Sequence, residues 1–211
     1  MSSDKPQIIL ASASPRREQL LREMGIHFVV VRPDGVEEQL GGAVPDVLAM
    51  QNAQRKARTV AGRHPDALVI GADTVVVLDG RIFGKPLDRA DAAGMLGRLA
   101  GRRHEVITGV CLIHRPLDTE LTFADTTRVW MRPLAHSQIA DYLDKINPLD
   151  KASGQYDYSE NWQKTHGFLS WAGAYAIQHG DIIERIEGSY NNVVGLPTER
   201  LQATLERLGM L

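Results

Sequence analysis

Short apolar runs alternate with amphipathic segments along the first third of this 211-residue chain, and that alternation limits what the chain can fold into. Residues 8–11 and 28–31 have the apolar composition of strands. Between them, Ser14 is placed to cap a helix, Pro15 suits its first turn, and Gly25 suits its end. The chain is therefore predicted to begin strand, helix, strand.

The same two patterns continue further along. Residues 45–61 have helical spacing closed by Gly62, and an apolar strand from residue 67 passes through Asp73 to residue 77 before a turn at 79–80. No internal repeat, charge block or linker interrupts the pattern, which allows one large domain or two lobes sharing a cleft. The remaining predicted elements are a strand at 81–83, a helix at 89–99 capped by Asp88, a hairpin of 105–113 with 119–131, a helix at 137–143, strands at 174–177 and 182–186, and a helix at 198–208.

The charge balance excludes one class of partner. The chain has 24 Lys and Arg against 26 Asp and Glu, so its net charge of −2 gives no global basic field that would attract duplex DNA. Residues 1–6 lack the layout of a signal peptide, and no apolar run is long enough to cross a bilayer. We therefore expect a cytoplasmic chain without nucleic-acid or membrane partners. Cys111, the single cysteine, lies in the apolar run 110–113 and is expected to be a packed strand residue.

A candidate anion site follows the first predicted strand. Ser14, Arg16 and Arg17 bring a hydroxyl and two guanidinium groups to a helix N-terminus, where backbone N–H groups also point outward. Guanidinium groups match the two-point geometry of phosphate oxygens, and basic residues at a helix start are unfavourable unless an anion is bound. The alternative is a capped surface helix with two solvated arginines.

Three further residues are candidates for chemistry. Asp73 lies in an apolar strand, where a carboxylate needs a metal, a water or another partner, although neighbouring N–H groups could serve. Lys85 lies in a Gly-Lys-Pro turn that would aim one ammonium group, unless it is an ordinary exposed lysine. Glu37 follows a strand and could add a metal-binding carboxylate, or could simply be solvated.

Two common catalytic arrangements are absent from the sequence. The seven histidines show no metal-ligand spacing and no Ser-His-Asp or Cys-His pattern, so we interpret them as structural or exposed. The glycines do not form a P-loop, because Lys85 is followed by Pro86 rather than Ser or Thr. A kinase or general phosphatase would need one of these features.

The order of the motifs along the chain and the residues within them resemble those of the Maf family of nucleotide pyrophosphatases over nearly the whole chain. The strongest signature is Leu-Ala-Ser-Ala-Ser-Pro-Arg-Arg at residues 10–17. The other matching segments are 36–38, 52–53, 56–57, 71–74, 84–86, 108–110, 150–152, 173–178 and 193–197.

The resemblance implies an elongated α/β fold related to the inosine triphosphate pyrophosphatases. Residues 1–211 would form one domain with a mixed sheet and two lobes around a central cleft, and the usual form would be a homodimer. The activity implied is the hydrolysis of a nucleoside triphosphate to its monophosphate and pyrophosphate, for house-cleaning of the nucleotide pool. The family's divalent cation would be Mg²⁺ or Mn²⁺.

The resemblance also assigns roles to residues. Asp73 corresponds to the catalytic acidic residue and Glu37 to a second acidic residue, so both are candidate metal ligands. We hypothesise that water attacks the α-phosphorus, with Asp73 orienting or deprotonating it; whether Asp73 is base, metal ligand or both is left open. The residues that correspond to the phosphate-binding set are Ser14, Arg16, Arg17, Lys56 and Lys85.

Three residues indicate the substrate branch. Arg16, Thr74 and Gln178 make the chain similar to the branch that acts on dTTP and UTP rather than to the 7-methyl-GTP branch, and Gln178 is a candidate for contacting the base or its surroundings. Modified pyrimidine nucleotides are further candidate substrates. Residues 153–172 look like an insertion between the Asp-Lys-Ala and Gly-Ala-Tyr motifs. An alternative alignment would place residues 154–156 on the second motif and leave Gln178 without an assigned role.

A non-catalytic alternative is also open. Maf proteins are associated with arrest of septum formation and cell division, so the chain could be a nucleotide-binding regulator. The intact Asp73 and Lys85 favour the enzyme.

Overall fold

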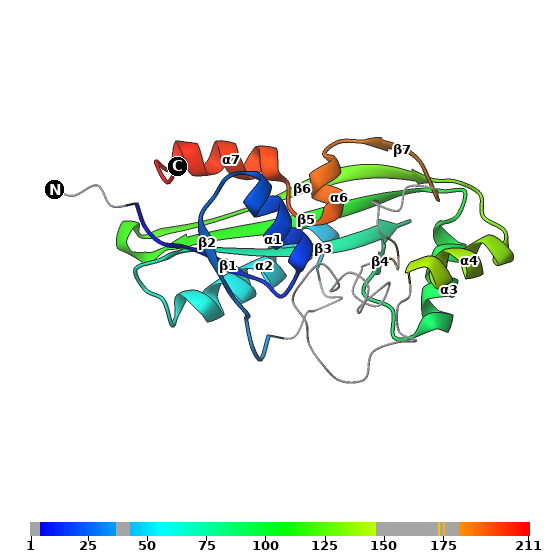
Figure 1. Cartoon of the computed structure of the whole chain (residues 1–211), viewed down its shortest axis with the longest axis horizontal. Helices are drawn as coiled ribbons and strands as arrows, with labels where there is room; N and C mark the ends of the chain where they lie inside the picture. Colours follow the sequence, from blue (N-terminus) through cyan, green and yellow to red (C-terminus); the bar gives the residue numbers. More distant parts are fainter. Residues whose placement is uncertain (1–4, 37–42, 147–172, 174, 176–181) are drawn as a thin grey trace. The chain divides into compact units, whose positions relative to one another are not determined.

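The computed structural model describes residues 5–36, 43–146, 173, 175 and 182–211. Figure 1 shows the order of the helices and strands along the chain. The strands form a seven-stranded sheet in the order β2-β1-β3-β5-β6-β7, with β4 paired to β3. The β1–β2 and β1–β3 pairs are parallel, whereas the β3–β4 and β6–β7 pairs are antiparallel. The predicted α/β class with a mixed sheet is therefore confirmed.

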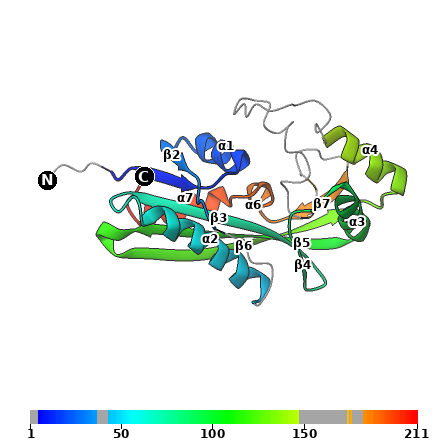
Figure 2. The same cartoon turned by 90° about the horizontal axis from the view of Figure 1, so that it is seen from below.

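The first five elements form two parallel crossovers. Strand β1 (Ile8–Ala11) pairs with β2 (Phe28–Val31) on one side and with β3 (Leu68–Leu78) on the other. The connecting helices are α1 (Pro15–Glu23) and α2 (Pro45–Ala61). Right-handed crossovers that run in opposite directions along a sheet place their helices on opposite faces, and Figure 2 shows α1 and α2 on opposite sides of β3.

Two glycines determine how closely α2 packs on the sheet. A Cβ atom on Gly71 of β3 would lie 2.4 Å from the Ala53 carbonyl oxygen, and one on Gly109 would lie 2.3 Å from the Ala49 carbonyl carbon. Both distances are shorter than any real side chain tolerates. The absence of a side chain at these positions therefore lets the backbone of α2 approach the strands directly.

The middle of the chain continues as hairpins and short helices. β4 (Arg81–Phe83) folds back on β3, and α3 (Arg89–Leu99) begins at Asp88, whose Oδ1 accepts a hydrogen bond from the Asp91 backbone N–H at 2.8 Å. This cap was predicted. The following elements are β5 (Arg103–His114), a 3₁₀ turn (Arg115–Leu117), β6 (Thr119–Met131) and α4 (His136–Ile146).

The C-terminal part adds one strand and two helices. β7 (Ile183–Glu187) pairs with β6, and α7 (Thr198–Arg207) is the predicted amphipathic helix. The five-residue helix α6 (Tyr190–Val194) was not predicted, because it is too short to show a helical period. Helix α4 is longer than the predicted 137–143. Of the predicted strand 174–177 only Tyr175 is described, and the predicted insertion 153–172 lies outside the described residues.

The chain divides into two compact units. Unit 1 comprises residues 1–74, 107–127 and 188–211, and unit 2 comprises residues 75–106 and 128–187. Among the described residues, no helix is long and apolar enough to cross a membrane. The predicted cleft between two lobes stays a prediction.

One hydrophobic core cluster of unit 1 lies between α2 and strands β1, β3 and β5. Its members are small or β-branched, which suits a helix packed at close range. Cys111 belongs to it, as predicted, and burial raises the pKa of its thiol to about 12, so the thiol is protonated and inert at neutral pH. The cluster consists of Ile9, Ala11, Ala53, Ala57, Val60, Ala61, Ala67, Val69, Cys111 and Ile113.

Candidate active site

A buried carboxylate lies on strand β3. Asp73 is only 3% exposed, and each of its two oxygens accepts a hydrogen bond from helix α2. Lys56 Nζ lies 2.6 Å from Oδ1, and Asn52 Nδ2 lies 2.9 Å from Oδ2. Removing a carboxylate from water costs several kcal/mol unless a countercharge and hydrogen bonds replace the solvent. Lys56 and Asn52 supply both, so the charge is held in one fixed orientation.

The geometry of α2 explains why these two side chains meet one carboxylate. Asn52 and Lys56 are four residues apart and therefore lie on the same face of the helix. The close approach at Gly71, two residues before Asp73 on the same side of the strand, brings that face against the carboxylate. Lys56 was assigned to the site from the resemblance. Asn52 belongs to one of the matching motifs, but no role was predicted for it.

A second group of side chains meets strand β3 at the next residue. Thr74 follows Asp73 and points to the opposite face, where Arg17 of α1 lies. Arg17 donates hydrogen bonds from each of its guanidinium nitrogens: Nε to the Gly195 carbonyl oxygen at 2.8 Å, Nη2 to Thr74 Oγ1 at 3.0 Å, and Nη1 to Ser12 Oγ at 3.4 Å. Its guanidinium group therefore ties α1 to β3 and to the end of α6.

The hydrogen bonds beyond Thr74 have a fixed direction. Thr108 Oγ1 donates its proton to the Asn192 carbonyl oxygen at 2.9 Å. A hydroxyl has only one proton, so in the 3.0 Å contact between Thr74 and Thr108 the donor is Thr74. Because Arg17 also donates to Thr74, these hydrogen bonds form one series that runs from Arg17 through Thr74 and Thr108 to the Asn192 carbonyl oxygen, the final acceptor.

Asn192, the last residue in this series of hydrogen bonds, was not predicted from the sequence. Asn192 lies in α6, its backbone N–H donates to Ser189 Oγ at 3.1 Å, and its side-chain amide donates to Thr127 Oγ1 at 3.0 Å. Ser189 is therefore the N-cap of α6. The signal available in the sequence was a serine, a common N-cap residue, three residues before Asn192, with Gly195 at the expected helix end.

The predicted anion site at the start of α1 has the predicted local form. Ser14 is the N-cap with Pro15 after it, but the Ser14 side chain makes no capping hydrogen bond; its backbone N–H donates to Ser12 Oγ at 3.1 Å. Burial, with a smaller effect from the charge on Arg17, lowers the pKa of Arg16 to about 9. Both effects disfavour positive charge there, and a bound anion would offset them.

The structure brings together only some of the predicted site residues. Lys56 joins Asp73 on one side of β3, and Arg17 joins Thr74 on the other. Lys85 lies between β4 and α3 in unit 2. Glu37 and Gln178 lie outside the described residues. Among the residues that are described, no three carboxylate, imidazole or thiol side chains form a metal-binding cluster.

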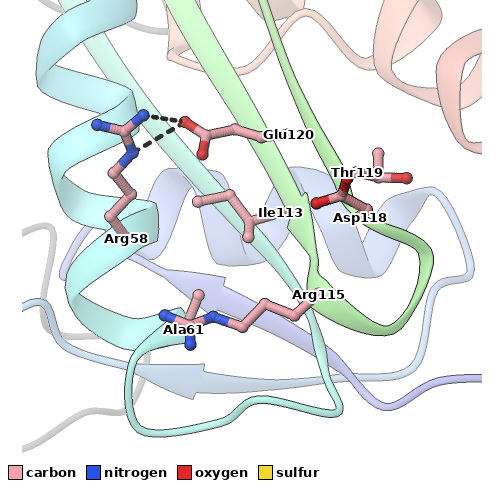
Figure 3. Close-up of a pocket in the computed structure, with 7 residues that line it drawn as sticks. All are labelled: Arg58, Ala61, Ile113, Arg115, Asp118, Thr119 and Glu120. Atoms are coloured by element: carbon pink, nitrogen blue, oxygen red, sulfur yellow. Dashed lines mark hydrogen bonds and ion pairs between the residues drawn. The ribbon is translucent and has the colours of Figure 1, made fainter.

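A pocket of about 350 Å³ lies elsewhere in unit 1, beside the turn from β5 to β6 (Figure 3). It contains none of the predicted site residues. Two of its charged side chains neutralise each other, because Arg58 donates to Glu120 through Nε at 2.9 Å and Nη2 at 2.8 Å. Its lining is Arg58, Ala61, Ile113, Arg115, Asp118, Thr119 and Glu120.

Fold and site together define a class of protein. It is an α/β protein in which strand β3 carries a buried carboxylate paired with a lysine on one face and a threonine bound by a guanidinium group on the other face. Comparison with known sequences gives the family. The sequence profile described as "Maf-like protein" matches residues 7–161 and 155–208. The chain belongs to the Maf family.

Curated relatives match over almost their full length. A dTTP/UTP pyrophosphatase from Symbiobacterium thermophilum is 44% identical over 205 residues, which cover 96% of this chain and 94% of the relative. A dTTP/UTP pyrophosphatase from Geobacter sulfurreducens is 42% identical over 210 residues, which cover 99% and 100% of the two chains. Among solved structures, the Staphylococcus aureus Ham1 protein aligns with a TM-score of 0.48 at 17% identity, covering 96% of this chain and 99% of that one.

Proposed function

We propose that this chain is a nucleoside triphosphate pyrophosphatase that hydrolyses dTTP and UTP, and modified pyrimidine nucleotides, to the monophosphate and pyrophosphate. Its role would be house-cleaning of the nucleotide pool. The observation that carries the proposal is the buried Asp73 carboxylate held by Lys56 and Asn52, in a chain whose curated relatives are named dTTP/UTP pyrophosphatases. A cytoplasmic location and a homodimer are part of the proposal and rest on the family resemblance.

Asp73 is the proposed catalytic residue. A carboxylate fixed at both oxygens is preorganised to orient or deprotonate an attacking water, because neither oxygen has to rotate into place. The phosphates would be held by Ser14, Arg16, Arg17, Lys56 and Lys85. The lowered pKa of Arg16 supports an anionic ligand, because a phosphate beside it would offset the cost of burying its charge next to Arg17.

The Asp73 carboxylate could supply an oxygen ligand to a hard divalent cation. Mg²⁺ prefers oxygen ligands and commonly uses one or two carboxylates together with substrate phosphates. Each oxygen of Asp73 accepts a hydrogen bond from α2, and a carboxylate oxygen has a second lone pair that could reach a cation. Asp73 and Glu37 are the proposed protein ligands of Mg²⁺ or Mn²⁺. The cation would supply charge neutralisation of the triphosphate.

The direction of the hydrogen bonds at Thr74 supports a preference for uracil and thymine. Thr74 donates its proton to Thr108 and accepts from Arg17, so toward a nucleobase it offers only a lone pair. Uracil and thymine carry an N3–H donor that could meet this lone pair, whereas cytosine has an acceptor at N3 and could meet it only through its 4-amino group. Arg16 and Gln178 are the other proposed specificity residues.

The inserted stretch 153–172 lies outside the described residues, and we propose that it affects substrate choice or assembly. The family profile matches the chain in two separate segments, 7–161 and 155–208. The break between the two matches falls within the stretch 153–172, which supports an interruption of the family's pattern there. Three large side chains, Trp162, Phe168 and Trp171, would be costly to leave in water. A direct join of Ala152 to Gly173 should change the Michaelis constant and base preference if the insertion meets the nucleotide. It should change only stability or dimerisation if the side chains pack on the protein's own surface or a partner subunit.

The decisive experiment measures the products. The purified chain is incubated with dTTP, UTP, CTP and 7-methyl-GTP in the presence of Mg²⁺ or Mn²⁺, and pyrophosphate and orthophosphate are assayed separately. The expected result is pyrophosphate from dTTP and UTP, less from CTP, least from 7-methyl-GTP, and none after EDTA is added. Orthophosphate as the first product would contradict the proposal, and tight binding without turnover would favour a non-catalytic regulator of cell division.

A further inference from the structure

We propose that Arg55 and Asn52 act as a positioning pair for Asp73: Arg55 fixes the side-chain amide of Asn52, and that amide fixes the orientation of the carboxylate. This inference rests on the proposed catalytic role of Asp73. The guanidinium group of Arg55 donates to Asn52, and Asn52 in turn donates to Asp73, so Arg55 would act on the carboxylate through Asn52.

The contacts leave the amide of Asn52 one favourable orientation. Arg55 Nη2 donates to Asn52 Oδ1, and Asn52 Nδ2 donates to Asp73 Oδ2. If the amide were turned over, its oxygen would face a carboxylate oxygen and its NH₂ group would face a guanidinium group. Both contacts would then be repulsive, because the carboxylate only accepts hydrogen bonds and the guanidinium group only donates them.

The helix makes this arrangement compact. Arg55 follows Asn52 by three residues, so both side chains lie on the same side of α2, and Lys56 follows Asn52 by four residues. Asn52 is 1% exposed and Asp73 is 3% exposed, so solvent cannot replace the amide if it turns away. The role of Arg55 is therefore to keep the NH₂ group of Asn52 facing Asp73.

The test is a double-mutant cycle on turnover of dTTP or UTP. Arg55→Gln should lower kcat by about tenfold with little change in KM, because partners that orient a reactive group cost this much when removed. Asn52→Ala should lower kcat at least as much. In the Asn52→Ala background, Arg55→Gln should have no further effect on kcat, because the group through which Arg55 acts is already gone.

Two further variants serve as controls. Arg58→Gln, three residues further along the same helix, removes an arginine that contacts Glu120 and should leave kcat unchanged. Arg55→Lys keeps a cationic donor and should recover part of the loss. An effect of Arg55→Gln that persists in the Asn52→Ala background would overturn the proposal. A rise in KM at unchanged kcat would overturn it as well, because it would assign Arg55 to substrate binding.

A second readout does not depend on activity. In wild-type protein, the side-chain NH₂ signals of Asn52 in a ¹H–¹⁵N spectrum should be sharp and exchange slowly with solvent, and Arg55→Gln should broaden them or speed their exchange. Unchanged Asn52 signals in Arg55→Gln would overturn the positioning role. If Asn52→Ala does not fold, this spectrum of Arg55→Gln decides alone. If the wild-type chain releases no pyrophosphate, the proposed function fails, whereas the spectrum still tests the pair.

Discussion

Helix α2 binds two carboxylates on two different faces, each through one amide side chain and one cationic side chain. On one face, Asn52 and Lys56 donate to Asp73; on another, Gln54 and Arg58 donate to Glu120. Each pair is an amide followed four residues later by a cation, and the charged groups lie 2.6 Å apart in the first case and 2.8 Å apart in the second. The donors and distances are therefore nearly equal.

Burial distinguishes the two pairs. The side chains of Lys56 and Asp73 are 8% and 5% exposed, whereas those of Arg58 and Glu120 are 60% and 35% exposed. Water can replace a partner lost from the exposed pair but cannot do so for the buried pair. Contact geometry alone therefore does not identify a functional carboxylate. The burial of the pair from solvent is what distinguishes Asp73 from Glu120.

The largest difference should appear when the cation is removed. Lys56→Met should lower the free energy of unfolding by about 3–5 kcal/mol, because it leaves the Asp73 charge buried without a countercharge. Chemical denaturation monitored by circular dichroism measures this. Arg58→Met is the matched change on the exposed pair. Equal losses in the two variants would show that burial does not separate the pairs.

Activity should separate the two carboxylates next. Asp73→Asn keeps the shape of the side chain and should lower kcat/KM by at least about a hundredfold, as expected for one positioned charge at a reacting phosphate. Glu120→Gln should leave turnover unchanged, because the pair that Glu120 forms with Arg58 is largely exposed to solvent and Glu120 is not one of the predicted site residues. Pyrophosphate release with UTP provides the measurement. Near-normal turnover of Asp73→Asn would refute its catalytic assignment.

The sequence was sufficient to predict most of the elements and part of the site. The bounds of α2 and α3 follow from local signals, such as Pro45, Gly62 and the Asp88 cap, which need no knowledge of tertiary contacts. Asp73 was recognisable because a carboxylate in an apolar strand needs a partner. The resemblance then supplied Lys56, which the residue pattern alone did not single out.

The partners of these residues could not be predicted, because they depend on which helix packs on which strand. Asn52 is 21 positions from Asp73, and Thr108 and Asn192 are 84 positions apart. The spacing of Asn52 from Leu48 and Ala49 places it on the apolar face of α2, but nothing local shows which residue it meets there. Gly71 and Gly109 belong to matching motifs, but their function is visible only once α2 lies against them.

The close approach of α2 can be tested directly. A Cβ at Gly71 would lie 2.4 Å from the Ala53 carbonyl oxygen and 2.9 Å from the Ala57 Cβ, so Gly71→Ala must push the helix away from Asp73. The expected loss is about 1–3 kcal/mol of unfolding free energy, as for other overpacked sites. Lower turnover should accompany it. Thermal and chemical denaturation, together with the UTP assay, measure both effects.

Gly94 of α3 supplies the control for this change. A Cβ there meets nothing closer than Arg98 Nη2 at 3.8 Å, so Gly94→Ala should stabilise the chain by about 0.5–1 kcal/mol through the better helix propensity of alanine. If Gly71→Ala were also neutral or stabilising, the close contact between α2 and β3 would not hold the buried pair in place.

The smallest effect is expected at the exposed pair. In a double-mutant cycle of Arg58→Gln and Glu120→Gln, the coupling energy should be about 0.2–1 kcal/mol, because solvent screens both charges and the pair must order two flexible side chains. Raising the salt concentration from roughly 0.01 M to 1 M shortens the screening length about tenfold and should reduce this coupling further. The coupling of Lys56 with Asp73 should change much less, since their charges are shielded from ions by the protein around them. Equal salt dependence of the two couplings, measured by denaturation at both salt concentrations, would mean that solvent reaches Asp73 as freely as it reaches Glu120.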